Sequence, residues 1–289
     1  YFDFSRMAAS ARTPLRLVDQ QTADIVKLLV RESEAKSRYA TFSLPALSTF
    51  TTVITVPEMT SRELVQAIPY EAKQYIPLPL SEIILDWHII GRKAASLANG
   101  AGITSKTNQL EIFIAAFPKE MVNKFSRIAK LAGLELRALE LETFSLIRSS
   151  APPPASLAHG GETRSAPIAV LDLGANSSNI SIVKNGFIHA THNFDVSGST
   201  FTSTLSSALQ VDQKRAESIK IQQGLLGRDG EAEISKIIVP LVAMILQESD
   251  RVMGSFARKT NEKISKIVVG GGSANLPGLV GRFVEHFGV

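Results

Sequence analysis

The stretch at residues 168–184 carries the side chains with the clearest potential for chemistry. Its sequence, IAVLDLGANSSNISIVK, is an apolar run that reaches Asp172, a polar break, and a second alternating apolar run. The pattern predicts two antiparallel strands joined by a tight turn. Such a turn can present backbone N–H groups and short side chains to phosphate oxygens, and an aspartate at a strand end can hold Mg²⁺ through water. The alternative is an ordinary hairpin with polar residues at its tip. The candidate residues are Asp172, Gly174, Asn176, Ser177 and Ser178.

A second candidate is a glycine-rich loop that follows a predicted strand and leads into a predicted helix. It consists of Gly270, Gly271, Gly272 and Ser273. This position suits a nucleotide-binding turn. The loop lacks a dinucleotide-binding fingerprint, since Asn275 stands at the third glycine position, and no Gly-Lys-Ser/Thr follows as in a P-loop. Its missing side chains would let a base or a ribose lie against the backbone, although a plain strand-to-helix turn explains the same residues.

A third candidate is a pair of charged residues on one predicted helix. Glu217 and Lys220 are three positions apart, so their heads lie on the same side of the helix. An intrahelical ion pair is the usual explanation of this spacing, and a ribose clamp is the alternative. Gly198, directly before another predicted helix, is a further candidate for close backbone approach.

The sequence gives little support for a metal site or for a catalytic nucleophile. His189 and His192 lie on one predicted strand at a spacing that points them to opposite faces. The sequence has no Gly-x-Ser-x-Gly elbow. Glu140 and Glu142 could form an acid pair of the glycosidase type, but a solvated edge is the simpler interpretation.

Composition limits the classes of protein. The chain has 289 residues, 44% of them hydrophobic and 20% charged, which is typical of a soluble globular protein with a sizeable core. It has no cysteine, which excludes disulfides and thiolate metal sites. The net charge of +4 is modest and the basic residues are scattered, so nucleic-acid binding is not favoured. No apolar stretch is long enough to span a bilayer, which leaves membrane association to a partner or to another segment.

The elements that position these candidates follow from apolar periodicity and from turn residues. Strands at 39–47 and 50–56 are predicted to share a first sheet. Pro69 predicts a kink or break in one helix, and Pro240 predicts a kink or restart in another. Asn185-Gly186 predicts a type I′ hairpin turn. The predicted helices are 17–30, 61–75, 119–132, 142–149, 199–209, 213–223, 231–258 and 278–287, and the remaining strands are 83–90, 109–116, 134–139, 187–194 and 264–269.

Two segments are predicted to be irregular. Residues 92–108 are rich in Ala, Ser, Gly, Thr and Asn and predict a mobile loop. Residues 151–165, APPPASLAHGGETRS, combine stiffening prolines with small polar residues and predict a linker. A boundary between two halves of the chain is therefore expected at 151–165.

Taken together, these features resemble a known family. The order of an Asp-x-Gly hairpin, Gly198 before a helix, the Glu217 and Lys220 pair and a strand running into a glycine loop resembles the second half of the actin-like ATPase superfamily. Within it, residues 67–80, AIPYEAKQYIPLPL, followed by the sequence LDW at 85–87, resemble the type IV pilus assembly protein PilM family, a relative of the cell-division protein FtsA.

The resemblance implies an α/β protein with an actin-like (ribonuclease H-like) two-lobed fold and a small inserted α/β subdomain. The first lobe would span 1–150, with the inserted subdomain at about 60–139. The linker would be 151–165 and the second lobe 166–289. The chain would be incomplete at both ends, because the first phosphate loop of the family and its terminal strand and helix are not found in it.

The resemblance also assigns roles to the candidates, with ATP and Mg²⁺ as ligands. Asp172, Gly174 and 176–178 would form the second phosphate loop, with Asp172 holding Mg²⁺ through water. Glu217 and Lys220 would contact ribose and adenine. The remaining assignments are Gly198 on the phosphate side, Gly270, Gly271, Gly272 and Ser273 around the base, and Glu142 near the position that orients the attacking water.

The partners implied by the resemblance belong to the pilus machine. A groove beside the inserted subdomain would receive the N-terminal cytoplasmic peptide of PilN, and further contacts would involve other pilus motor components. The protein would be cytoplasmic and peripheral to the inner membrane through this partner, with no direct membrane insertion and at most slow ATPase activity. The sequence leaves a homo-oligomer open. The alternatives are an FtsA-like division scaffold and a small-metabolite kinase, such as a sugar or acetate kinase, of the same superfamily.

Overall fold

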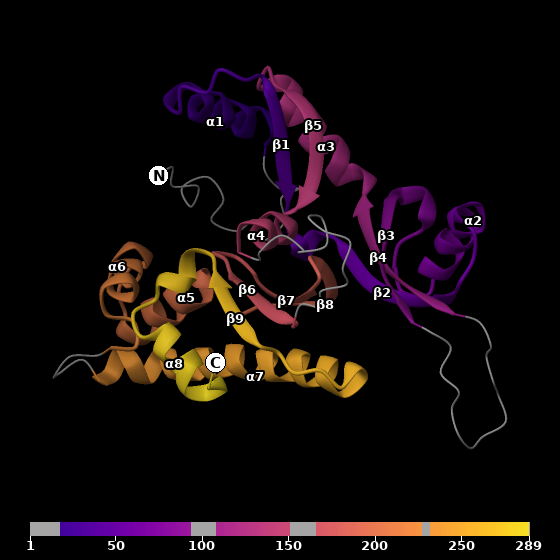
Figure 1. Ribbon diagram of the computed structural model, residues 1–289. Coiled ribbons are helices and arrows are strands. Elements are labelled where there is room, and N and C mark those ends of the chain that lie inside the picture. Colours follow the sequence, from indigo (N-terminus) through magenta and orange to yellow (C-terminus); the bar gives the residue numbers. More distant parts are fainter. Residues whose placement is uncertain (1–17, 94–107, 151–165, 227–231, 289) are drawn as a thin grey trace. The chain divides into compact units, whose positions relative to one another are not determined.

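The computed structural model describes residues 18–93, 108–150, 166–226 and 232–288 (Figure 1). The chain divides into two compact units, Tyr1–Ser145 and Leu146–Val289. The predicted linker at 151–165 and nearly all of the predicted loop at 92–108 lie outside the described residues.

A two-stranded parallel sheet in the first unit joins segments that are far apart in sequence. Strand β1 (Tyr39–Leu44) pairs with β5 (Glu135–Leu141). Helices α1 (Asp19–Glu32) and α3 (Lys119–Leu131) pack against each other beside this sheet (Figure 1). The short helix η3 (Ala46–Ser48) follows β1, and α4 (Glu142–Ser150) follows β5 directly.

The other sheet of this unit is antiparallel. Its order is β2 (Phe50–Pro57), β4 (Gln109–Pro118) and β3 (Ile83–Lys93). Helix α2 (Ser61–Ala72) covers one face, where Leu64, Ile68 and Ala72 join the apolar side chains of the strands in one core. The helix η4 (Leu80–Glu82) leads into β3. Hydrogen bonding thus groups β2 with β3 and β4, and β5 with β1, while the inserted subdomain predicted at about 60–139 stays a prediction.

One prediction for this unit is wrong, and another is narrowed. The strands predicted at 39–47 and 50–56 do not share a sheet, because the chain turns through η3 after Pro45 and β2 then pairs with β4. Helix α2 continues through Pro69, so the break does not occur, and the alternative, a kink at Pro69, stays a prediction. A capping box fixes the start of α2: Glu63 N donates to Thr60 Oγ1 at 3.4 Å and Thr60 N donates to Glu63 Oε2 at 2.7 Å.

The second unit is built on one four-stranded sheet. Its order is β8 (Phe187–Phe194), β7 (Ser178–Lys184), β6 (Ile168–Leu173) and β9 (Lys266–Gly270), with β9 parallel to β6. The predicted hairpin is confirmed, because β6 and β7 are antiparallel neighbours. The type I′ prediction is supported too, since Asn185 and Gly186 both have positive φ. The other elements are α5 (Gly198–Leu209), α6 (Gln213–Gln223), α7 (Ala232–Thr260), η6 (Gly272–Asn275) and α8 (Leu279–Phe287).

Strand alternation decides which face of this sheet meets the helices. Ala169, Leu171 and Leu173 of β6 belong to one apolar core together with side chains of α5, α6, α7 and α8. Asp172 lies between two of these residues and therefore projects to the opposite face, at the carboxyl end of the strand. Helix α7 continues through Pro240 as one helix, so it does not restart there, and the alternative, a kink at Pro240, stays a prediction. Burial of neighbours such as Ile238 and Val242 in the core helps to offset the one backbone hydrogen bond that proline removes.

A buried ion pair ties α1 to α3. The Lys124 side chain is only 6% exposed, and its Nζ lies 2.5 Å from Asp19 Oδ1, while Arg127 Nε donates to Asp19 Oδ2 at 3.0 Å. Hydrogen bonds from Lys124 and Arg127 hold the pKa of Asp19 below its usual range.

We expect Asp19→Asn to lower the free energy of unfolding by about 1–3 kcal/mol, because it removes the charge opposite a buried ammonium. A carboxyl group with a lowered pKa contributes stability that is present at neutral pH and is lost as the pH falls through its folded-state pKa. The difference from the unaltered protein should therefore shrink below a pH of about 4. Urea titration followed by fluorescence of Trp87, the single tryptophan, measures both effects in this unit.

The matched control is Asp24→Asn on the same helix. Asp24 pairs with Lys27, and both side chains are about half exposed. Exposed pairs contribute little, so its effect should stay below about 0.5 kcal/mol. Equal losses for Asp19→Asn and Asp24→Asn would contradict the role given to the buried pair.

Candidate functional site

The turn between β6 and β7 is held by backbone contacts. Gly174 N donates to Ser177 O at 3.0 Å, and a Cβ on Gly174 would lie 2.7 Å from that same oxygen. Asn176 is exposed at the tip of the turn. Ser178 is buried and donates its hydroxyl to Val196 O at 2.6 Å, so its side chain anchors the turn from below.

The start of α5 lies against this turn. Gly198 N donates to Gly174 O at 2.9 Å, and Ser199 N donates to Ala175 O at 2.8 Å. These bonds use two N–H groups that a helix N-terminus would otherwise leave unpaired. A Cβ on Gly198 would lie 2.8 Å from Ser273 Oγ and 3.4 Å from Gly174 O, so a larger residue would have to displace the Ser273 hydroxyl. The turn and the helix N-terminus therefore form one frame.

The glycine loop after β9 closes the same frame. Gly271 has a φ of 86°, and a Cβ there would lie 2.5 Å from Leu173 O and 2.6 Å from Asp172 Oδ1. Ser273 is buried and its hydroxyl donates to Gly174 O at 3.4 Å. A Cβ on Gly272 would meet no atom within 4 Å, so this part of the loop borders open space.

Asp172 is the carboxylate of this frame. It pairs across the sheet with Gly270 and lies beside Gly271. Burial raises the pKa of its carboxyl group. Among the residues that the structure describes, no three His, Cys, Asp or Glu side chains converge as a metal cluster. A metal held here would therefore need ligands from water or from a bound phosphate as well as from Asp172.

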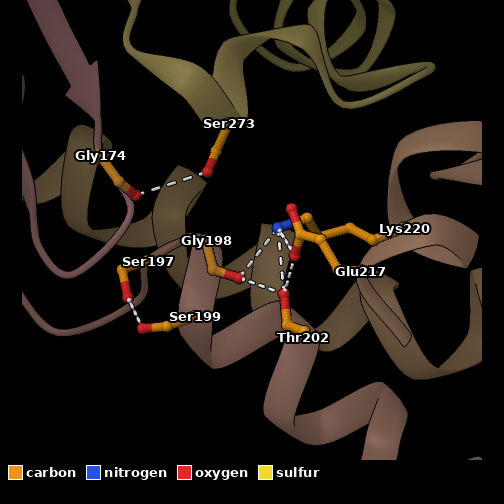
Figure 2. A network of polar contacts seen from close by, with 8 residues as sticks. All are labelled: Gly174, Ser197, Gly198, Ser199, Thr202, Glu217, Lys220 and Ser273. Atoms are coloured by element: carbon orange, nitrogen blue, oxygen red, sulfur yellow. Dashed lines mark hydrogen bonds and ion pairs between the residues drawn. The ribbon is translucent and has the colours of Figure 1, made fainter. Parts of the chain in front are cut away.

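Glu217 and Lys220 reach the frame from α6 (Figure 2). Lys220 Nζ contacts Glu217 Oε2 at 2.6 Å, Thr202 Oγ1 at 3.0 Å and Gly198 O at 3.2 Å. Thr202 Oγ1 also donates to Glu217 Oε2. The side chain of Lys220 is 10% exposed, whereas that of Glu217 is 44% exposed. The Glu217 carboxylate is therefore partly exposed to solvent, whereas the Lys220 ammonium that it contacts is buried.

The structure therefore brings most of the predicted residues together in the second unit. These are Asp172, Gly174, Gly198, Gly271, Ser273, Glu217 and Lys220, joined by the contacts above. Glu142 lies in the first unit, where its Oε1 accepts a hydrogen bond from Ala46 N at 2.8 Å and holds η3.

Sequence reasoning missed Thr202 and the hollow in the first unit. Thr202 is buried one turn after Gly198, and the only sequence signal is a hydroxyl in the first turns of a helix. The hollow has a volume of about 250 Å³. It is lined by Asp86, Trp87, His88, Phe113, Ala115, Phe117, Leu139, Glu140, Leu141 and Phe144.

The walls of this hollow are mainly aromatic. Phe113 and Phe144 stack edge to face, with ring centroids 5.6 Å apart. Two carboxylates line it: Asp86 is exposed, and Glu140 Oε1 accepts a hydrogen bond from Ser145 Oγ at 2.5 Å. An apolar wall with two acidic groups suits a short segment that carries apolar side chains and a positive charge.

The fold places the protein in the class of α/β proteins with an actin-like fold. A solved structure described as MreB5 of Spiroplasma citri bound to ADP shares this fold with a TM-score of 0.51 and 14% identity, over 94% of this chain and 71% of that chain. The family model described as "Type IV pilus assembly protein PilM" matches residues 16–289. The chain therefore belongs to the PilM family of type IV pilus assembly proteins.

Two further comparisons agree with this assignment. A solved structure described as a PilM–PilN type IV pilus biogenesis complex is similar with a TM-score of 0.77 and 25% identity, covering 96% of this chain and 77% of that chain. The cell division protein FtsA of Streptococcus pneumoniae serotype 2 (strain D39 / NCTC 7466) is 25% identical over 196 residues, which is 60% of this chain and 40% of that protein. The chain spans less than half the length of the curated relatives it matches.

We expect Gly271→Ala to lower the free energy of unfolding by about 2 kcal/mol, because the new Cβ meets Leu173 O and Asp172 Oδ1 and the backbone has a left-handed φ. Gly272→Ala is the matched control, since its Cβ enters open space, and its effect should stay within about 0.5 kcal/mol. Thermal unfolding followed by circular dichroism compares the two. Similar melting temperatures for both variants would refute the close packing of the glycine loop on β6.

Proposed function

We propose that this protein binds ATP with Mg²⁺ in its second unit and the N-terminal cytoplasmic peptide of PilN in its first unit, as a scaffold in type IV pilus assembly. The observation that carries the proposal is the family match over residues 16–289, which favours this function over an FtsA-like division scaffold and over a small-metabolite kinase. Similarity to a PilM–PilN complex over 96% of the chain supports PilN as the partner.

The geometry of the second unit suits a nucleotide. Backbone groups of the β6–β7 turn and of the start of α5 lie together, and the open side of Gly272 leaves room for a flat base. In this proposal Asp172 holds Mg²⁺ through water, and Mg²⁺ offsets the negative charge of the phosphates. Asn176 and Ser177 extend the turn toward solvent. With Glu142 bonded to Ala46 N, we propose slow hydrolysis at most.

The hollow of the first unit suits the partner peptide. An N-terminal peptide carries a positive α-amino group, which complements Asp86 and Glu140, and its apolar side chains can enter the aromatic wall. A volume of about 250 Å³ takes one or two side chains rather than a whole nucleotide. We therefore assign the peptide to the hollow and the nucleotide to the second unit.

The proposed location of this protein in the cell follows from its proposed partner, PilN. Within the described residues, every helix is too short or too polar to cross a membrane. We propose that the protein is cytoplasmic and is held at the inner membrane through PilN, where it also meets other components of the pilus motor.

Asp172→Ala is expected to abolish the Mg²⁺-dependent part of ATP binding by the full-length protein. Removing one charge-assisted contact of about 1.5–3 kcal/mol weakens binding at least about tenfold. Calorimetric titration with ATP, with and without Mg²⁺, measures the effect. The control is Asp250→Asn, an exposed carboxylate on α7 that pairs with His286. An unchanged ATP affinity in the Asp172→Ala variant would contradict the assignment of Asp172 to the nucleotide site.

The pH dependence of binding has a defined sign. Because burial raises the pKa of Asp172, protons compete with Mg²⁺ at a higher pH than at an exposed aspartate. We expect Mg²⁺-dependent ATP affinity to fall as the pH is lowered from neutral, before exposed carboxylates are protonated. Calorimetry between pH 7 and 5 checks this, and an affinity that is constant over that range would contradict it.

Asp86→Lys is expected to weaken binding of the PilN N-terminal peptide at least about tenfold, because it places a positive charge where the peptide brings its own. Glu82→Lys is the matched control, since Glu82 is exposed on η4 and does not line the hollow. Fluorescence anisotropy with a peptide labelled at its C-terminus measures both. Acetylation of the peptide N-terminus should weaken binding to the unaltered protein and change little in Asp86→Lys. Equal effects of Asp86→Lys and Glu82→Lys on peptide affinity would contradict the assignment of the peptide to the hollow.

A further inference from the structure

Exposed cations gather where α7 ends and the chain leads into β9. They form what we call the basic cluster, which consists of Arg258, Lys259, Lys263 and Lys266. All four residues are exposed. Within the part of the chain that the structure describes, none of their side chains forms an ion pair or a side-chain hydrogen bond. Their charges are therefore available to an external anion.

The one carboxylate among residues 258–266 does not neutralise the cluster. Glu262 Oε1 lies 2.6 Å from Lys184 Nζ of β7, and these side chains are 34% and 19% exposed. Lys184 and residues 258–266 together carry five cations and one carboxylate, a net charge of +4. The whole chain also has a net charge of +4, so the charges of all its other residues cancel. The excess positive charge of the protein is thus concentrated in this small region.

Backbone hydrogen bonds hold the segment that carries the cluster. Asn261 N donates to Ala257 O at 2.8 Å, and Ser265 N donates to Pro167 O at 2.9 Å. Only five residues, 261–265, separate the end of α7 from the start of β9 (Figure 1). The Cα atoms of the four cations therefore lie within roughly 25 Å of one another. Because the backbone is already fixed, binding of a ligand orders little more than the side chains.

The basic cluster lies at the end of the sheet away from Asp172. Lys266 pairs with Ile168 at the start of β6, whereas Gly270 pairs with Asp172 near the end of that strand. The four residues from Ile168 to Asp172 correspond to about 13 Å along the strand. A ligand of the basic cluster therefore leaves the candidate nucleotide site open.

The side chains of the cluster do not all point from one side of the sheet. Ile267 packs on the apolar core that includes α7, so Lys266 projects from the opposite face of the sheet. Arg258 and Lys259 lie on α7 itself, and Lys263 lies in the loop that follows. We therefore take Arg258, Lys259 and Lys263 as the centre of the cluster and Lys266 as its edge.

The chemistry of the cluster fits a surface that carries many anions. Three of its four cations are lysines, whose ammonium groups act as point charges and not as planar forks for one phosphate. Residues 258–266 contain no aromatic side chain that could stack on a nucleic-acid base. A layer of anionic phospholipid headgroups offers diffuse negative charge, and each Lys or Arg near such a layer strengthens binding about fivefold.

We propose that the basic cluster contacts anionic phospholipid headgroups at the membrane surface, without insertion, and so supplies a second membrane contact beside PilN. This inference rests on the proposed function, which holds the protein at the inner membrane. A few cations alone give weak, reversible binding. Attachment through PilN raises the local concentration of headgroups around the cluster, so the two contacts reinforce each other.

Co-sedimentation of the full-length protein with lipid vesicles, in the absence of PilN, tests the inference. The unaltered protein should bind vesicles of phosphatidylglycerol and phosphatidylcholine at low salt, bind vesicles of phosphatidylcholine alone far less, and be released by added salt. The triple variant Arg258→Gln, Lys259→Gln and Lys263→Gln should bind the anionic vesicles about 100-fold more weakly, because it loses three cations.

The matched control is the triple variant Lys214→Gln, Arg215→Gln and Lys236→Gln. These three residues are exposed in the same unit, and both triple variants have the same net charge. Because the control cations lie outside the cluster, their loss should weaken vesicle binding less than about threefold. Equal losses in the two triple variants overturn the proposal, as does the absence of vesicle binding by the unaltered protein at low salt.

Competition separates headgroups from other anions. Inorganic phosphate at constant ionic strength should leave vesicle binding unchanged, because a single phosphate offers no extended surface. Displacement of the vesicles by inorganic phosphate would indicate a phosphate site instead. Displacement by a DNA duplex that binds through the same three cations would assign the cluster to nucleic acid. Either displacement overturns the proposal.

The affinity for the PilN N-terminal peptide in solution separates this inference from the proposed function. Both triple variants should bind the peptide as the unaltered protein does, which also shows that they fold. If the unaltered protein binds the peptide and not the anionic vesicles, only this inference falls. If it does not bind the peptide, the proposed function falls, whatever the vesicles show.

Discussion

The approach of the β6–β7 turn to the first residue of α5 is the constraint on which the candidate site depends. Gly174 and Gly198 meet through a backbone hydrogen bond of 2.9 Å, with Ser273 Oγ directly above them. A Cβ on Gly174 would lie 2.7 Å from Ser177 O, and a Cβ on Gly198 would lie 2.8 Å from Ser273 Oγ. Because this approach is made by backbone atoms, the turn and the helix N-terminus keep their relative positions without depending on flexible side chains, and the Ser273 hydroxyl joins the glycine loop to them.

A buried polar network completes this frame. Lys220, Thr202 and Glu217 place a charged pair next to the start of α5, with the ammonium inside and the carboxylate outside. A buried cation that lost its acceptors would be costly, so the pair holds α6 and α5 in one arrangement. The apolar core beneath, shared by the sheet and α5, α6, α7 and α8, supplies the stability that such a network draws on.

The first unit has a different surface chemistry. One face of its antiparallel sheet is buried under α2, and the other presents Phe113 to a hollow with Asp86 and Glu140 at its edge. Aromatic walls with a few charged groups favour a ligand that matches them in shape and charge. The two units of this PilM-family protein therefore differ in surface chemistry.

The sequence by itself determined most of the local elements of the fold. Apolar periodicity located β6, β7 and α6, and Asn185-Gly186 dictated its own hairpin turn, because these signals act over a few residues. It also supplied Asp172, Gly198, Glu217 and Lys220 as candidates. Only the tertiary structure decided that β2 pairs with β4 and not with β1. It also decided that the Lys220 ammonium contacts Gly198 O, Thr202 Oγ1 and Glu217 Oε2. These contacts join residues far apart in the chain, and which acceptors surround a buried ammonium is set by packing, which spacing along a helix cannot reveal.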